Sequence, residues 1–187
     1  MAEVPPDRLR DALVRFVTLL DAAGIAYMVV GALAVAVWGR PRATADIDVT
    51  VRADSAGLEA IVARARPSGF AIDDEWLAWN PLLRGVQARL TRDAVIVDVM
   101  RPRDDHEEAA FERRRSVAIE RRSIWLVAPD DLIVMKLKVG RPRDFEDAVA
   151  VLAEQRETLD EPYMTRWAER LGIADELAYL LRAGGPA

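Results

Sequence analysis

The sequence contains no cysteine in its 187 residues. That absence excludes disulfide bonds, thiolate metal sites and cysteine nucleophiles, and it fits a reducing compartment. Lysine is also scarce, because arginine supplies all the cationic side chains except Lys136 and Lys138. The one histidine, His106, stands among charged residues, and we expect it to lie in a surface loop.

No long hydrophobic run is present. The longest apolar stretch, residues 26–38, is interrupted by Gly31 and is too short to span a bilayer. The N-terminal residues 1–11 are polar, acidic and contain two prolines, so they do not have the pattern of a secretory signal. We therefore expect a soluble, cytoplasmic protein with no membrane partner.

Positive charge is in deficit, with a formal net charge of −5 and a pI of about 5.1. A protein of this charge does not attract nucleic acid in bulk, although a local basic face remains open. The arginines of residues 113–115 and 121–122, with Arg101 and Arg103, can form such a face for RNA. We favour the alternative, a solvated surface balanced by nearby glutamates. These are Glu107, Glu108, Glu112 and Glu120.

Hydrophobic periodicity predicts alternating helices and short strands. The expected helices cover residues 7–23, 32–38, 55–65 with Ser55 as its cap, 129–139 and 143–154, followed by two short ones from residue 161. The expected strands cover residues 26–30, 46–51, 70–72, 86–90, 95–100, 117–119 and 124–127, with a turn at 91–94. This order indicates an α+β fold, with a small mixed β-sheet, helices packed on one side and a helical C-terminal part.

Asp46 and Asp48 are separated by one residue in the expected strand 46–51, so both project to the same face. Two neighbouring carboxylates repel each other, and aspartate is a poor strand former. A hard divalent cation such as Mg²⁺ would offset this cost. The alternative is a polar strand edge in which Arg40 or Arg42 pairs with the aspartates.

Asp98 interrupts the apolar run at residues 95–100, where an unpaired charge is costly to bury. Two-metal sites commonly use a third carboxylate, and Asp98 is the best candidate for it. An aspartate at a strand end can also be a simple turn former.

Gly31 ends a strand and begins a helix fifteen residues before Asp46. Free backbone N–H groups at a helix start can hold a phosphate, and glycine permits close approach. An ordinary strand–helix turn would look the same. The glycine turn and the Asp-Ile-Asp strand together indicate a site that holds both the phosphates and a bridging metal.

Residues 30–48 resemble the signature of the DNA polymerase β-like nucleotidyltransferase superfamily, in which a glycine turn precedes an Asp-x-Asp strand. The Arg-x-Thr-x-Asp-Ile-Asp version at residues 42–48 resembles minimal nucleotidyltransferases of the AbiEii/MenT toxin type and DUF6036-like proteins. Residues 136–147, with a lysine, a Gly-Arg turn and Asp-x-x-Asp, resemble the second block of that group. The resemblance implies a single nucleotidyltransferase-like domain over residues 1–187, with a core at about 25–155 and a C-terminal helical extension at about 156–187.

The resemblance also implies roles for individual residues. Asp46, Asp48 and Asp98 would be the catalytic carboxylates that bind Mg²⁺, or Mn²⁺ in its place, with Asp98 activating the acceptor hydroxyl. The nucleotide-binding residues would be Gly31, Ala32, Arg42, Thr44, Lys136 and Arg141. Asp144 and Asp147 would position Lys136 or Arg141, although acidic residues are favoured in a first helical turn in any case.

Two positions depart from the family pattern. Ala32 replaces the usual glycine or serine and removes a hydroxyl that would contact phosphate, and Trp38 stands where related sequences often carry histidine. Three further tryptophans, Trp76, Trp79 and Trp125, can stack on a base, but we expect them to pack in the core.

The implied activity is transfer of a nucleoside monophosphate from an NTP to a hydroxyl on a tRNA 3′ end or a protein. The implied setting is the toxin-like component of a toxin–antitoxin system with a cognate antitoxin. Two alternatives are a non-catalytic nucleotide-binding or antitoxin-like interaction domain and a small-molecule transferase of the aminoglycoside type.

Overall fold

The computed structural model describes residues 4–119 and 122–183. Its strands are β1 (Tyr27–Val30), β2 (Asp46–Val51), β3 (Ala71–Ile72), β4 (Gln87–Arg92), β5 (Val95–Met100), β6 (Arg115–Ile119) and β7 (Arg122–Leu126). Its α-helices are α1 (Pro6–Ala22), α2 (Gly31–Trp38), α3 (Ser55–Ala65), α4 (Asp74–Trp79), α5 (Asp105–Arg113), α6 (Pro129–Val139), α7 (Pro142–Gln155), α8 (Glu161–Leu171) and α9 (Ala174–Ala183).

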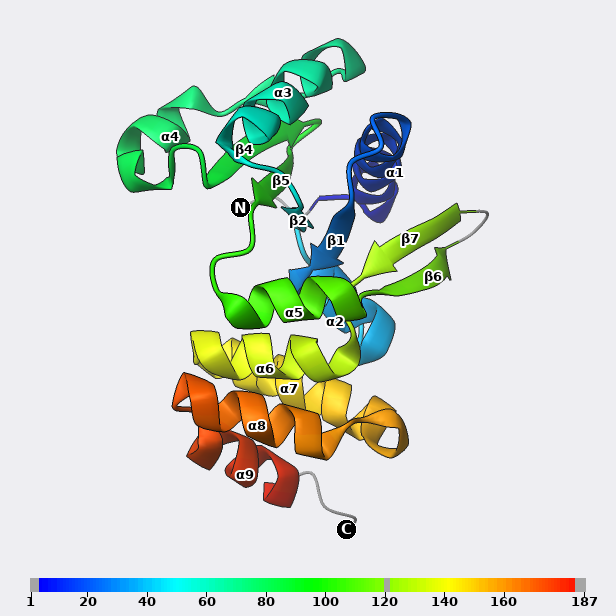
Figure 1. Cartoon of the computed structure of the whole chain (residues 1–187). Helices are drawn as coiled ribbons and strands as arrows, with labels where there is room; N and C mark the ends of the chain where they lie inside the picture. The colour runs from blue at the N-terminus through cyan, green and yellow to red at the C-terminus, as the bar shows by residue number, and fades with distance from the viewer. Residues whose placement is uncertain (1–3, 120–121, 184–187) are drawn as a thin grey trace.

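The strands form one mixed sheet in the order β3-β4-β5-β2-β1-β7-β6. The pairs β2–β5 and β1–β7 are parallel, and the other neighbouring pairs are antiparallel. Below the sheet in Figure 1, α5, α6, α8 and α9 follow one another as a stack of helices. The expected α+β fold with a helical C-terminal part is confirmed.

The two central strands β2 and β5 are buried by their alternating apolar residues. Ile47, Val49, Val97 and Val99 are fully buried in the core. Because side chains alternate along a strand, the intervening polar residues of these strands project to the opposite face. The sheet core therefore fixes the orientation of the aspartates of β2 and β5.

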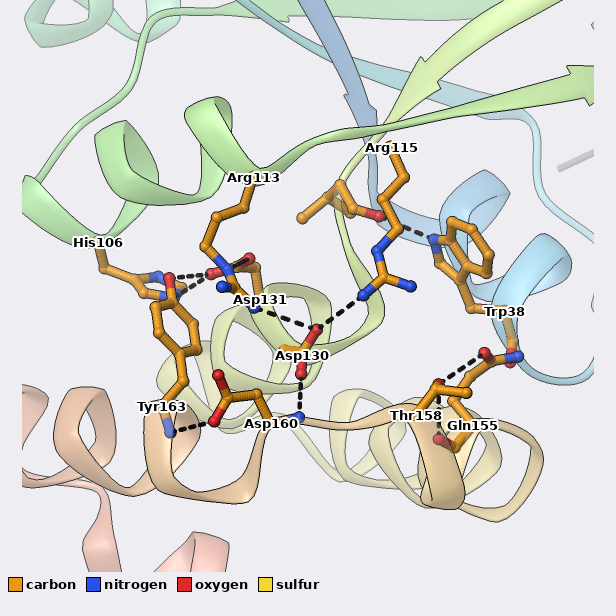
Figure 2. A network of polar contacts seen from close by, with 11 residues as sticks. Trp38, His106, Arg113, Arg115, Asp130, Asp131, Gln155, Thr158, Asp160 and Tyr163 are labelled. Carbon is orange, nitrogen blue, oxygen red and sulfur yellow. Dashed lines mark hydrogen bonds and ion pairs between the residues drawn. The ribbon is translucent and has the colours of Figure 1, made fainter.

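A buried polar network joins α5 and α6 to α8 (Figure 2). Asp131 on α6 accepts hydrogen bonds from the Tyr163 hydroxyl at 2.6 Å and from Arg113 Nε at 3.1 Å, and it lies 3.2 Å from His106 Nε2. Asp130 beside it accepts from the backbone N–H of Asp160 at 2.6 Å. Buried charges of this kind are tolerated only when they are paired, so the network ties the C-terminal helices to the rest of the protein.

Our expectation for His106 was wrong. The residue lies on α5, a helix that the sequence did not predict, and its side chain is fully buried. Its ring packs edge-on against Trp167, with 5.1 Å between the ring centroids. Glu107, expected to be solvated, is also buried and binds Arg103 and Lys138.

The arginines around α5 are occupied by protein contacts. Arg113 and Arg115 form ion pairs with Asp130, and the Arg114 guanidinium lies over the rings of Phe111 and Trp125. They therefore do not form the simple solvated face that we favoured. Glu120 and Arg121 lie outside the described residues.

Three other sequence expectations need correction. The cap of α3 is Asp54, whose side chain accepts from the Gly57 N–H, and not Ser55. The hairpin turn consists of Asp93 and Ala94 alone, both with positive φ. Trp79 and Trp125 were expected in the core but are 81% and 38% exposed. No helix among the described residues is long and apolar enough to cross a membrane.

Candidate active site

The carboxylates of the site are placed by strand register. In the β2–β5 pair Asp48 is opposite Asp98, and in the β5–β4 pair Asp98 is opposite Arg89. Residues opposite each other on neighbouring strands project to the same face. Asp48, Asp98 and Arg89 therefore form a row across three strands, with Asp46 two residues from Asp48 on the same face.

Across residues 4–119 and 122–183, neither Asp46 nor Asp48 forms an ion pair with a lysine or arginine. Oδ1 of Asp46 is buried without a hydrogen-bond partner. Burial, together with the charges of Asp98 and Asp46, raises the pKa of Asp48 to about 6, and the cations Lys136 and Arg89 offset this only in part. Arg40 pairs with Glu154 and Arg42 with Asp147, so the alternative of a polar strand edge lacks both of its expected partners.

Gly31 packs directly against the Asp48 carboxylate. Its φ is +66°, a conformation that favours glycine. A Cβ added at this residue would lie 2.0 Å from Asp48 Oδ2, well inside van der Waals contact. The glycine that begins α2 is therefore required for two reasons, its own backbone conformation and the space that the Asp48 carboxylate occupies.

Asp98 is held by Arg89 through both oxygens. Arg89 Nε donates to Oδ1 at 2.8 Å and Nη2 donates to Oδ2 at 2.7 Å. This hydrogen bonding raises the pKa of Arg89, and its guanidinium also lies 4.6 Å from the ring centroid of Trp76. The sequence analysis did not single out Arg89.

A second cluster, formed by Arg42, Lys136, Asp144 and Asp147, borders the site. Lys136 Nζ donates hydrogen bonds to Asp144 at 2.9 Å and to Asp147 at 2.8 Å. Arg42 forms a bidentate pair of hydrogen bonds with Asp147. Burial would raise the pKa of Asp147, but the hydrogen bonds from Arg42 and Lys136 outweigh it and lower the pKa. The carboxylates of these two residues of α7 thus hold Lys136 and Arg42, whereas Asp144 meets Arg141 through the backbone, where its N–H donates to the Arg141 carbonyl at 2.9 Å.

These groups surround a cavity of about 760 Å³, a volume typical of small-ligand sites. Its lining includes every site residue expected from the sequence except Asp147, which lies behind Lys136 and Arg42. Thr44 lies in the lining, and its hydroxyl bonds to the backbone N–H of Asp46 at 3.2 Å. Arg143, which the sequence analysis did not name, also lines the cavity next to Arg141.

The donor set fits a hard divalent cation at Asp46 and Asp48, because an unpartnered buried oxygen and a crowded carboxylate face the same cavity. Across residues 4–119 and 122–183, no three acidic or histidine side chains form a ready-made metal cluster. Asp98 faces the same cavity and is hydrogen-bonded to Arg89 through both of its oxygens.

The family model of nucleotidyltransferases of unknown function (DUF6036) matches residues 9–168. The chain belongs to this family. The protein is therefore a nucleotidyltransferase, as the Gly31 turn and the Asp46–Asp48 strand indicated. No curated protein sequence matches it.

Solved structures share the fold of this nucleotidyltransferase. An antigenic nucleotidyltransferase-like protein from Paracoccidioides brasiliensis superposes with a TM-score of 0.59 at 17% identity, over 97% of this chain and 95% of that chain. The lincomycin-bound lincosamide antibiotic adenylyltransferase LnuA gives a TM-score of 0.56 at 16% identity, over 80% and 98% of the two chains. The antibiotic-resistance factor ANT(2″)-Ia gives 0.54 at 17% identity, over 84% and 91%.

Proposed function

We propose that this nucleotidyltransferase moves a nucleoside monophosphate from an NTP to a hydroxyl acceptor in a reaction that depends on Mg²⁺, with Mn²⁺ as a substitute. The observation that carries the proposal is the pair of unneutralised carboxylates, Asp46 and Asp48, packed against Gly31 at the start of α2. A metal bound there and phosphates at the helix start would balance each other's charge.

Asp46 and Asp48 would hold the metal, with Asp98 as a third ligand. When bound, the metal supplies Lewis-acid stabilisation of the charge that develops on the phosphate oxygens. Gly31 and Ala32 offer backbone N–H groups at the start of α2, which suits a phosphate without any side-chain hydroxyl at Ala32.

The remaining cations divide the phosphate charge between them. Lys136 and Arg42 are hydrogen-bonded to carboxylates that balance their charge, so they would orient the phosphates more than neutralise them. Arg141 and Arg143 are exposed at the cavity and have no ion pair among the described residues, so they can neutralise the triphosphate. Thr44 braces the segment that leads into β2 through its bond to the Asp46 N–H.

The transfer forms one bond and breaks one bond. The acceptor hydroxyl oxygen attacks the α-phosphorus, the bond from that phosphorus to the bridging oxygen of the β-phosphate breaks, and pyrophosphate leaves. Asp98 receives the hydroxyl proton. Asp98 lies opposite Asp48 in the sheet, so the residue that takes the proton and the residues that hold the metal share one face.

For the acceptor we propose a macromolecular hydroxyl, either a tRNA 3′ end or a protein side chain, in a cytoplasmic toxin-like role controlled by a cognate antitoxin. The support is the similarity of residues 30–48 and 136–147 to the AbiEii/MenT pattern, together with the family membership. The second candidate, a small-molecule transferase, is supported by the shared fold with LnuA and ANT(2″)-Ia.

The test incubates the purified protein with each α-³²P-labelled NTP and Mg²⁺ in separate reactions with total RNA, soluble protein, lincomycin or an aminoglycoside. We expect label transfer by the wild type and none by Asp48→Asn. The matched control is Asp93→Asn, an identical charge change on an exposed turn residue, which should act like the wild type. Equal label in wild type and Asp48→Asn would exclude the proposed site, and no transfer to any acceptor would favour a non-catalytic nucleotide-binding domain.

A further inference from the structure

We propose that Arg89 is an internal counter-ion of Asp98 that a divalent cation must displace, so that Arg89 lowers the affinity of the site for metal. This inference rests on the proposed metal-dependent function, because it concerns the same carboxylates. Arg89 is a positioning residue, because it acts on the metal through the Asp98 carboxylate.

The geometry of the pair shows why the metal and Arg89 compete. Two parallel hydrogen bonds of 2.8 and 2.7 Å occupy both oxygens of Asp98 on the side that Arg89 faces. Charge-assisted, two-fold bonds between a guanidinium and a carboxylate are among the stronger protein hydrogen bonds. A divalent ion at the same carboxylate would also repel the guanidinium, so binding a metal through Asp98 weakens or breaks this pair.

The environment of the pair strengthens the competition. The side chains of Arg89 and Asp98 are 24% and 10% exposed, so water screens their attraction less than at an open surface. Sheet register places the two residues directly opposite each other, and the Trp76 ring supports the guanidinium from another side. Because both residues lie on neighbouring strands, the sheet keeps Arg89 beside Asp98 in the metal-free protein.

The three carboxylates differ in their hydrogen-bond partners. Asp98 is neutralised by Arg89, whereas Asp46 has an unpartnered buried oxygen and Asp48 has no hydrogen-bonded cation in the described residues. Within the described part of the chain, no three acidic side chains form a metal cluster. In that part of the chain two of the carboxylates are thus without a hydrogen-bonded cation, whereas a metal that binds Asp98 must compete with Arg89.

The test measures Mn²⁺ affinity of the full chain at pH 7.5 by electron paramagnetic resonance of free Mn²⁺, without nucleotide. The variant Arg89→Met removes the charge and keeps an unbranched side chain. We expect it to bind Mn²⁺ about tenfold more tightly than the wild type, the effect expected when the charge-assisted Arg89–Asp98 pair no longer competes. The matched control is Arg84→Met, the same charge change at an exposed residue outside the cavity lining, which should leave the affinity unchanged.

A double-mutant cycle with Asp98→Asn identifies the route of the effect. If Arg89 acts by occupying Asp98, then Arg89→Met has no effect on Mn²⁺ affinity in the Asp98→Asn background. Thermal unfolding checks that each variant is folded. If Arg89→Met does not fold, Arg89→Lys carries the test, because lysine keeps the charge but loses the planar two-fold bond, and we expect a gain of about threefold.

An Arg89→Met affinity equal to or weaker than that of the wild type would overturn the inference, as would an equal gain in the Asp98→Asn background. The proposed function fails separately. If the wild type binds no Mn²⁺, or if Asp48→Asn binds it as well as the wild type does, the metal site itself is absent and both proposals fall. If the wild type binds and Asp48→Asn does not, only the role of Arg89 is under test.

Discussion

Replacing Asp48 by asparagine should stabilise the metal-free protein at neutral pH while abolishing its response to metal. The folded-state pKa of about 6 lies above the ordinary value of 3.8, so the folded protein holds this proton more tightly than the unfolded chain does. A shift of that size corresponds to about 3 kcal/mol at pH values above 6. Asparagine has nearly the same shape and no charge, so it still fits against Gly31 and removes this cost.

The pH dependence follows from the direction of the shift. Well below pH 3.8 the Asp48 carboxyl is protonated in both states and costs nothing. Between about pH 4 and pH 6 the folded protein binds more protons than the unfolded chain, so this residue lowers the stability of the wild type as pH rises. The advantage of Asp48→Asn should therefore be small at pH 4, grow up to about pH 6 and level off above it.

Urea unfolding with a chelator, followed by circular dichroism at several pH values, measures this difference. Asp93→Asn, on an exposed turn, controls for the change in net charge. Added Mg²⁺ should raise the stability of the wild type and not that of Asp48→Asn, because only a ligand that binds the native state stabilises it. A variant that is less stable than the wild type at pH 7.5 would refute the account of an unneutralised, buried Asp48.

Three further changes have definite expected outcomes. Gly31→Ala should destabilise the protein by at least about 1 kcal/mol and abolish Mg²⁺-dependent thermal stabilisation, since its Cβ would collide with the Asp48 carboxylate; unchanged calorimetric scans would contradict this. Tyr163→Phe should cost about 1–3 kcal/mol in urea unfolding, because it deprives the buried Asp131 carboxylate of a 2.6 Å bond; a neutral result would mean that the other partners of Asp131 suffice. Trp79→Ala should change the free energy of unfolding by no more than about 0.5 kcal/mol, because the side chain is 81% exposed; a larger loss would place Trp79 in a packed interface.

Residues close in sequence carried most of the correct predictions. The alternation in residues 46–51 predicted the strand, its buried face and the shared face of Asp46 and Asp48, because strand geometry has a period of two. The glycine at residue 31 predicted the start of α2 for the same local reason. The resemblance to nucleotidyltransferases came from these segments and from residues 136–147, whereas the fold class came from the order of the expected helices and strands.

Arg89 was missed because the turn expected at residues 91–94 was two residues too long, which shifts the register of the hairpin. A four-residue turn at residues 91–94 would place Gln87 opposite Asp98, whereas the observed two-residue turn places Arg89 there. The tight turn requires positive φ at both central residues, and asparagine–glycine is its usual signal. Here Asp93 and Ala94 adopt φ values of 50° and 69° without a glycine, so local sequence rules could not identify the turn.

The helix α5 was missed for a different reason. Its sequence is strongly charged, and its buried side chains include His106 and Glu107 as well as Ala110 and Phe111. The groups around these buried polar side chains come from residues distant in sequence, because Lys138 donates to Glu107 and Asp131 lies 3.2 Å from His106 Nε2. Such pairing is a property of the folded chain, so hydrophobic periodicity alone could not predict it.

The charges around the cavity separate into groups with different tasks. Lys136 and Arg42 are balanced by Asp144 and Asp147, so this cluster has no net charge and acts as a brace between the β2 approach and the start of α7. Arg89 balances Asp98 in the same way. The unbalanced groups are Asp46 and Asp48 on one side and the exposed Arg141 and Arg143 on the other. A metal ion bound to a triphosphate carries positive and negative charge at separate positions. The metal complements the two aspartates and the phosphates complement the two arginines.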